Sequence, residues 1–424
     1  MKYLFFILLI ACSSLWMTVG CSKKQDNPAK SIDTTSTVSY IDTLSPSVLL
    51  KHPGGLCTQS DFDRIKGKVS LGAEPWMSGW NKLISNSHAQ TTYLANPTTK
   101  IIRGGNSPEE PLPDNYGNAM NDAAAAFQLG IRWKITGDAT YAQAAVNILN
   151  AWANTCTACS GDPNVSLAIG IYGYEFAIAG EQLRDYSGWA PADFANYQQW
   201  MLKVFYPGAL AFLQNHDGCN TKFIWGNWDL CSMAAVMSIG ILTDNRSMYN
   251  YVINYFQHGT GNGNIFNLIP VVYNDQGLAQ WQESGRDQGH GTLELALLEV
   301  ICQLAWNQGD DLWGFNDNMI LKGSEYMAKY NVAFLEVPFT TVNYITDCQG
   351  DVGQLTSISS SSRGTVRPMW AMVYNHYVKI KGLTAQYTAM GVQTTQPEGG
   401  GGDYGSTSGG FDQFGFGTLL FSRD

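Results

Sequence analysis

The chain is poor in charged residues. Only 14% of its 424 residues are Asp, Glu, Lys or Arg, and the formal net charge is −10. Such an acidic chain is not expected to bind nucleic acid or an anionic membrane surface in a general way. An acidic polymer remains a possible ligand if basic side chains gather locally. The candidates for that cluster are Arg103, Arg132, Lys134, Arg286, Arg363 and Arg367.

Histidine is scarce, and the sequence lacks the usual metal and cofactor motifs. The six histidines form no HxxxH or HExxH pair. The CxxC motif Cys156–Cys159 has no second CxxC and no nearby histidine, which argues against zinc. No GxGxxG, P-loop or GxSxG pattern stands out in a strand–helix context. We therefore expect neither a metal nor a cofactor.

A long apolar run occurs only at the N-terminus. Lys2 precedes the apolar run Tyr3–Ile10, and the segment up to Gly20 is too short for a stable membrane span but typical of a signal peptide. The small residues before Cys21 resemble a bacterial lipobox, which would make this cysteine the lipidated first residue after cleavage. Residues 22–48 are polar and predict a flexible tether, and residues 49–424 a single folded domain. We expect an exported monomeric lipoprotein of the outer membrane, facing the periplasm or the cell surface, whose lipid is its sole membrane contact.

The cysteines do not define a disulfide framework. Nine are present, and setting aside the one in the signal peptide and the lipidated one leaves an odd number. Cys156 and Cys159 are open to a local disulfide or a redox role. Cys231 and Cys302 lie in apolar helical patterns and are predicted to be buried thiols.

Hydrophobic residues are plentiful, at 45% of the chain, and most of them recur at helical spacing. Helices are expected over Asn118–Gly137 and Ala139–Trp152, with Gly137 as a helix stop and Asp138 as an N-cap. Further helices are expected near Ser60 and over Leu167–Tyr186, Ala192–Phe205, Trp228–Leu242, Arg246–Phe256, Leu293–Trp306, Asn316–Tyr330 and Arg367–Ile380. Strand patterns are sparse, the best being Leu268–Tyr273 and Phe339–Ile345. No strict repeat indicates a solenoid. The predicted fold is all-α, an α/α toroid or incomplete barrel with long loops and few short strands.

A glycine-rich stretch, residues 398–410, lies near the C-terminus. One interpretation of this stretch is a flexible linker. The strongly apolar residues 411–421 follow it, so the chain must return to the core. We therefore expect the stretch to cover or line a site.

The densest group of reactive side chains is the run Trp281–His290, Trp-Gln-Glu-Ser-Gly-Arg-Asp-Gln-Gly-His. It combines two carboxylates, an arginine, a histidine, two amides and a tryptophan directly before an apolar helix pattern. Arg286 and His290 would share one helical face if the helix begins before them, and Glu283 would orient Arg286. A surface Glu–Arg pair with a solvated histidine is the alternative.

Asn227 precedes a long helix pattern that is rich in small residues. It is a good N-cap residue, and this alone would explain its place. Its amide could equally donate to an anionic group at the positive end of the helix. His216 lies in a polar loop shortly before Asn227, and His376 lies on a helix beside aromatic residues; a structural role is open for each.

The segments Gly226–Met233, Trp281–His290, Ala305–Trp313 and Thr136–Trp152, together with the glycine-rich tail, resemble the alginate lyase superfamily of α/α-toroid polysaccharide lyases. The resemblance covers roughly residues 50–424 and is closest to polysaccharide lyase family thirty-eight of Bacteroidetes. It implies cleavage of a uronate polymer, such as alginate (mannuronan) or glucuronan, by metal-independent β-elimination. That reaction needs a group that neutralises the C6 carboxylate, a base for the C5 proton and an acid for the departing O4.

By this resemblance, Asn227 matches the neutralising Asn and Arg286 matches the site Arg. Two positions depart from the pattern of well-characterised alginate lyases, because Trp228 replaces a His and Leu293 replaces a Tyr. The base is therefore open. The candidates for it and for a histidine partner are His290, His216, Tyr344, Tyr374 and Tyr116. The side chains expected to contact substrate are Trp225, Trp228, Trp281, Gln282, Glu283, Gln288, Tyr116 and Tyr404.

Two other functions fit the sequence less closely. A glycoside hydrolase on an α/α barrel would need two carboxylates, for which Glu283, Asp287 and Asp229 are available. A lipid-anchored glycan-binding protein would fit the lipobox, the aromatic residues and the helices. The concentration of polar groups in Trp281–His290 favours an enzyme.

Overall fold

The computed structural model describes residues 38–424, so the predicted signal peptide, Cys21 and most of the predicted tether lie outside the described residues. Tyr40–Asp424 form one compact unit. The ring of Tyr40 lies 4.7 Å from that of His258, and the Ile41 amide donates to Gln257 Oε1 at 2.6 Å. Residues from Tyr40 onward are therefore bound to a helix, although the sequence placed them in the tether.

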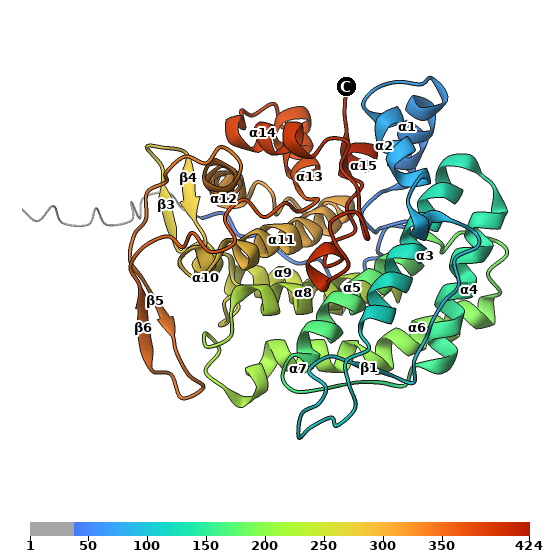
Figure 1. Ribbon diagram of the computed structural model, residues 1–424, viewed down its shortest axis with the longest axis horizontal. Coiled ribbons are helices and arrows are strands. Elements are labelled where there is room, and N and C mark those ends of the chain that lie inside the picture. Colours follow the sequence, from blue (N-terminus) through green and yellow to red (C-terminus); the bar gives the residue numbers. More distant parts are fainter. Residues whose placement is uncertain (1–37) are drawn as a thin grey trace, which may run out of the picture. The chain divides into compact units, whose positions relative to one another are not determined.

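Helices form most of this unit, in two layers (Figure 1), and the connections between them include two long segments, residues 85–116 and 332–369. The first layer contains α3 (Gly117–Thr136), α5 (Val165–Gln182), α8 (Gly226–Leu242) and α11 (Gln288–Gln308). Within it, α3 contacts α5, α5 contacts α8, and α8 contacts α11. The helices that follow them in sequence are α4 (Ala139–Thr155), α6 (Pro191–Val204), α7 (Tyr206–Asn215), α9 (Arg246–His258) and α12 (Phe315–Asn331).

The inner position of α8 follows from its composition. Every residue of α8 except Trp228 is buried. A helix that is apolar on all sides avoids water only inside the protein. In contrast, α9 buries one face, including Val252 and Ile253, and leaves polar residues on the other. Each helix that the sequence predicts between residues 118 and 330 is present, with ends that shift by a few residues.

Capping residues determine where several helices begin. Gly137 ends α3 in the left-handed conformation, and the side chain of Asp138 accepts from the Thr140 amide to start α4. Both roles were predicted. The side chain of Asn245 caps α9 in the same way, by accepting from the Met248 amide.

Three two-stranded sheets complete the helical layers. β1 (Lys100–Ile102) pairs in parallel with β2 (Ala158–Ser160), and β3 (Val271–Tyr273) pairs antiparallel with β4 (Leu278–Gln280). β5 (Val342–Ile345) and β6 (Val352–Leu355) form a hairpin in which Tyr344 lies opposite Gly353. Both predicted strand regions therefore contain a strand. None of the helices in residues 38–424 is long and apolar enough to cross a membrane.

Six further helices complete the unit. They are α1 (Gln59–Ser70), α2 (Trp76–Ile84), α10 (Ile265–Leu268), α13 (Trp370–Tyr374), α14 (Gln386–Thr395) and α15 (Gly417–Phe421). The helix predicted over Arg367–Ile380 is wrong at its start, since α13 begins only at Trp370. It continues as a π-helical turn over Asn375–Ile380. Pro368 and the hydrogen bonds of the Arg367 side chain account for the late start.

The glycine-rich stretch returns the chain to the core, so the flexible-linker interpretation is wrong. Phe411, Phe414 and Phe416 are buried. The ring of Phe414 stacks on Phe127 with centroids 3.9 Å apart. Gly415 has a φ of +70°, and a Cβ there would lie 2.1 Å from the Gly399 carbonyl oxygen, so only glycine fits.

A disulfide joins Cys219 to Cys348, whereas Cys156 and Cys159 are unbonded. The local disulfide considered from the sequence is therefore absent. Cys231 and Cys302 are buried free thiols, as predicted. The disulfide ties the loop between β5 and β6 to the loop that precedes α8.

Candidate active site

The N-terminus of α11 holds His290 in place. Asp287 is the N-cap: its Oδ1 accepts from the His290 amide at 2.8 Å, and its Oδ2 lies 2.7 Å from His290 Nδ1. Burial alone would raise the pKa of Asp287, but the hydrogen bonds from His290 hold it below its usual value. Arg286 precedes the helix, which begins at Gln288, so the condition for Arg286 and His290 to share one helical face is not met. Asp287 links them instead, with its Oδ2 3.7 Å from Arg286 Nε.

A buried carboxylate joins the starts of α8 and α11. Glu283 Oε1 accepts from Asn227 Nδ2 at 2.5 Å and from the Asn227 amide at 3.4 Å. Glu283 Oε2 accepts from Arg286 Nη1 at 2.6 Å. Burial raises the pKa of Glu283, while the positive charges of Arg286 and His290 oppose that rise. Glu283 thus brings together an amide and a guanidinium from two distant segments.

Trp225 and Tyr344 extend this cluster with aromatic surface. The Arg286 guanidinium lies 4.8 Å from the centre of the Trp225 ring. Tyr344, on β5, stacks on the same tryptophan with centroids 5.4 Å apart and an interplanar angle of 20°. Trp225, Arg286 and Tyr344 are all partly exposed. The Cys219–Cys348 disulfide holds the hairpin that carries Tyr344.

Arg367 fastens the glycine-rich stretch beside His290. It donates from Nε to Thr292 Oγ1 at 3.2 Å and from Nη1 to Gln413 Oε1 at 3.0 Å. Asp412 is also buried there, which raises its pKa, while the charges of Arg367, Arg103 and His290 lower it. Arg367 Nη1 lies 3.7 Å from Asp412 Oδ2, a carboxylate that the sequence did not single out.

Tyr116 lies at the outer side of this region. The Arg103 guanidinium is 5.0 Å from the centre of its ring, and Arg103 Nη1 lies 3.5 Å from the Tyr172 hydroxyl. Tyr116 also borders a surface hollow of about 310 Å³. The hollow is lined by Asp114, Tyr116, Gly117, Met120, Ser406, Thr407 and Ser408. Tyr116 is thus placed where it can meet a ligand.

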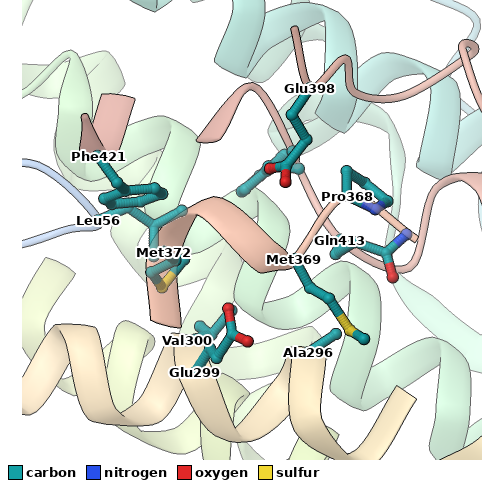
Figure 2. Close-up of a pocket in the computed structure, with 12 residues that line it drawn as sticks. Leu56, Ala296, Glu299, Val300, Pro368, Met369, Met372, Glu398, Gln413 and Phe421 are labelled. Atoms are coloured by element: carbon teal, nitrogen blue, oxygen red, sulfur yellow. The ribbon is translucent and has the colours of Figure 1, made fainter. Parts of the chain in front are cut away.

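A second, smaller cavity of about 20 Å³ lies along α11 and is not a substrate site. In Figure 2 the carboxyl groups of Glu299 and Glu398 point into it from opposite sides, with Met369 beside them. Burial raises the pKa of Glu398 to about 7, and burial together with the charge of Glu398 raises the pKa of Glu299 well above its ordinary value. This volume has room for about one water molecule, not for a sugar ring.

Three residues predicted to contact substrate instead support the backbone. Trp281 is fully buried and donates from Nε1 to the Gly323 carbonyl at 2.9 Å. Gln282 Oε1 accepts from the Gly226 amide at 3.2 Å. Gln288 Nε2 donates to the Ser284 carbonyl at 3.1 Å. Their amide and indole groups satisfy buried backbone groups around the starts of α8 and α11, so the substrate-contact prediction is wrong for all three.

His216, a predicted candidate for the base or its partner, is enclosed by the protein. It is fully buried, with Nε2 2.9 Å from Asp229 Oδ1, and the Tyr255 hydroxyl donates to Asp229 Oδ2 at 3.0 Å. This closed network leaves His216 no access to a polymer. Asp229 is equally inaccessible, and Asp287 is occupied as a helix cap, so the pair of free carboxylates that a hydrolase needs is missing at these positions.

Two of the predicted tyrosines lie elsewhere. Tyr374 is two residues before His376, whose ring packs 4.8 Å from Trp306, near the end of α11 opposite Arg286. The Tyr404 hydroxyl accepts from the Gly399 amide at 3.1 Å within the glycine-rich stretch. No contact among the described residues joins either tyrosine to Arg286. Trp228, the one residue of α8 that is not buried, remains available to a ligand.

The described residues do not suggest a metal centre. Among residues 38–424, no group of three or more His, Cys, Asp or Glu side chains is placed to hold an ion. The polar groups that converge are the amide of Asn227, the guanidinium of Arg286 and the imidazole of His290, which suit an anionic ligand.

The chain resembles known proteins in sequence and in fold. The family model described as alginate lyase matches residues 79–336. Alginate lyase A1-III from Sphingomonas species A1 is similar in structure, with a TM-score of 0.57 and 14% identity over 89% of this chain and 99% of that one. A variant of A1-III complexed with a tetrasaccharide has a TM-score of 0.58 and 15% identity over 89% and 98% of the two chains.

An alginate lyase from Bacteroides ovatus matches with a TM-score of 0.54 and 14% identity over 88% of this chain and 100% of that one. No curated protein matches the chain. The structural matches confirm the predicted α/α-toroid fold. Because the family model covers more than half of the chain, the protein belongs to the alginate lyase family and is a polysaccharide lyase.

Proposed function

We propose that the protein cleaves a uronate polymer, alginate (mannuronan) or glucuronan, by β-elimination without a metal or cofactor, leaving a 4,5-unsaturated end. The observation that carries the proposal is the Glu283 carboxylate, which binds Asn227 Nδ2 at 2.5 Å and Arg286 Nη1 at 2.6 Å. This one carboxylate holds two donors that come from different segments of the chain, Asn227 on α8 and Arg286 before α11. Such pre-organised donors stabilise a developing negative charge without having to reorganise.

In the proposed reaction, Asn227 and Arg286 neutralise the C6 carboxylate, which makes the C5 proton acidic. A base removes that proton, and its electron pair forms the C4–C5 double bond. The C4–O4 bond breaks, and an acid protonates the departing O4. In mannuronate and glucuronate the C5 proton and O4 lie on the same side of the ring, so one residue serves both steps.

Tyr344 is the proposed base and acid. Of the three candidate tyrosines, it is the one whose ring contacts Trp225, the residue that also contacts Arg286. As phenolate it accepts the C5 proton, and as phenol it returns a proton to O4. Its hairpin is fixed by the disulfide, which suits a residue that must be held within reach of its substrate.

His290 is the proposed partner in proton transfer. Its side chain is 44% exposed, and its Nδ1 is engaged by Asp287. A hydrogen bond at Nδ1 directs the other ring nitrogen, Nε2, toward substrate as the acceptor of a neutral imidazole.

The proposal also covers the location of the protein in the cell and the polysaccharide lyase family to which it belongs. The polar tether and the lipobox-like cysteine support an exported, monomeric lipoprotein of the outer membrane, facing the periplasm or the cell surface. The segments Gly226–Met233, Trp281–His290 and Ala305–Trp313 support a place in polysaccharide lyase family thirty-eight. The anionic polysaccharide is the proposed partner, and no nucleic acid is involved.

The test is a panel of purified polymers, namely polymannuronate, polyguluronate, glucuronan and a neutral glucan. We expect ultraviolet absorbance from unsaturated ends to rise with at least one uronan and with no neutral glucan. The Arg286→Ala variant should give no rise. Absence of a rise with every uronan, at enzyme concentrations that a known lyase needs, would contradict the proposal.

A further inference from the structure

Glu294 is a buried acid that the roles assigned so far leave unexplained. It lies on α11, four residues after His290, and is fully buried. No donor group among the described residues bonds to either of its carboxyl oxygens, and the contact that remains is a hydrogen bond with the side chain of another acid, Glu283. Burial of an unpaired polar group costs free energy, and burial of an unpaired charge costs far more.

Its surroundings place Glu294 directly behind the site. A Cβ added to Gly226 would lie 2.5 Å from Glu294 Oε1, so this oxygen rests against the first residue of α8, next to Asn227. Burial and the nearby charge of Glu283 both raise the pKa of Glu294. The carboxyl groups of Glu294, on α11, and of Glu283, in the turn Gln282–Gly285, therefore form a hydrogen-bonded pair next to Asn227.

Two buried neighbouring carboxyl groups do not both ionise. Glu283 faces Arg286 at 2.6 Å and accepts from Asn227, so it is stabilised as the anion. The described charged groups that act on Glu294 are Glu283 and Arg286, and Arg286 pairs directly with Glu283. Glu294 thus retains the proton, and a protonated acid has one O–H to donate.

We propose that Glu294 is a positioning residue: its neutral carboxyl group supports the Glu283 carboxylate from inside the protein, and Glu283 holds the Asn227 amide and the Arg286 guanidinium toward substrate. The inference rests on the proposed function. It also accounts for Gly226, since any side chain there would collide with the Glu294 carboxyl group. One N–H of the Asn227 amide is used by Glu283, which leaves the second for the substrate carboxylate.

The test compares Glu294→Gln with Glu294→Met. Glutamine keeps the shape and a neutral donor, so kcat/KM should stay within about threefold of the wild-type value. Methionine keeps the volume but has no donor. Loss of a hydrogen bond to a charged group predicts a fall in kcat/KM of about 10- to 100-fold. The pKa of Glu283 would also rise, which should move the acid limb of the kcat/KM profile up by about one pH unit.

Infrared difference spectra test the protonation without any substrate. At pH 7 the wild-type protein minus Glu294→Gln should show the carbonyl band of one protonated, buried carboxyl group. Its absence would overturn the proposal. Equal rates and equal pH profiles of the Gln and Met variants, at equal thermal stability, would also overturn it, because a residue that merely fills space predicts that result.

The two proposals fail in different ways. If the wild-type protein forms no unsaturated product from any uronan, the proposed function fails and the positioning role fails with it. The infrared band would then still show that Glu294 is protonated in the folded protein. If the wild-type protein is active but the band is missing, only the role of Glu294 is lost.

Discussion

The side-chain nitrogen of Asn227 lies 2.5 Å from Oε1 of Glu283, although 56 residues separate them in the sequence. The other oxygen of the same carboxylate binds Arg286 at 2.6 Å. This shared carboxylate fixes the relative position of two groups that would otherwise depend on two separate helix ends.

Glu283→Gln should lower kcat/KM by about 100-fold or more. The amide keeps the shape but replaces one acceptor oxygen with a donor, which leaves Arg286 without its buried partner. The measurement is initial rate against concentration of the preferred uronan. Glu109→Gln, at an exposed position, is the matched control and should retain the wild-type value. A Glu283→Gln enzyme with unchanged kcat/KM would refute the role of this carboxylate.

Tyr344→Phe should lower kcat by about 100- to 10,000-fold with a small change in KM, because it removes the proposed proton-transfer group and keeps the aromatic ring. Stacking on Trp225 is retained by phenylalanine. Tyr374→Phe is the control, since Tyr374 lies away from Arg286, and it should be as active as the wild-type protein. If Tyr344→Phe keeps its kcat and His290→Asn loses it, His290 is the base instead.

Removal of the disulfide should affect both activity and stability. In the Cys219→Ser, Cys348→Ser double variant, the hairpin that presents Tyr344 loses its covalent tie to the loop before α8. We expect kcat/KM to fall by about tenfold and the free energy of unfolding by about 2–4 kcal/mol. Urea unfolding and steady-state kinetics measure the two effects. Cys159→Ser, which breaks no disulfide, should change neither.

Glu398 should make the protein less stable as pH rises. Its pKa is about 7 in the folded protein, against an ordinary value of 4.5. A carboxyl group whose folded pKa is raised stabilises the fold fully below its unfolded pKa, and that contribution is lost as pH rises through the folded pKa. Between pH 4.5 and 7 the loss is up to about 3 kcal/mol.

The measurement is the free energy of unfolding of the wild-type protein and of Glu398→Gln from pH 5 to pH 8. The difference between the two should shift in favour of Glu398→Gln as pH rises, because glutamine does not titrate. Glu109→Gln serves again as the exposed control. Parallel stability profiles for the wild-type protein and Glu398→Gln would show that Glu398 does not titrate in this range.

Local patterns were enough to predict the helical architecture. The Gly137–Asp138 boundary and the apolar periodicity of α8 and α11 are properties of short segments. The Glu283–Arg286 pair was also predictable, since the two residues lie three apart. The return of the glycine-rich stretch followed from the apolar residues after it.

The remaining features depend on contacts between distant segments. Trp281 was expected to contact substrate, but the Gly323 carbonyl provides a partner for its indole inside the core. The number of cysteines does not indicate which of them pair, so the Cys219–Cys348 disulfide could not be predicted from the sequence. The sequence around His216 resembles a polar loop, but in the structure His216 forms a buried hydrogen bond with Asp229. Asp229 is near in sequence but lies on another element.

Cleavage of the preferred uronan in water enriched with oxygen-18, followed by mass spectrometry of the products, tests the central claim most directly. β-Elimination breaks the C4–O4 bond and takes no oxygen from water. We therefore predict unsaturated fragments, one water lighter than hydrolysis products, whose new reducing ends carry no label in short reactions. Saturated fragments with oxygen-18 at the new reducing end would contradict the account.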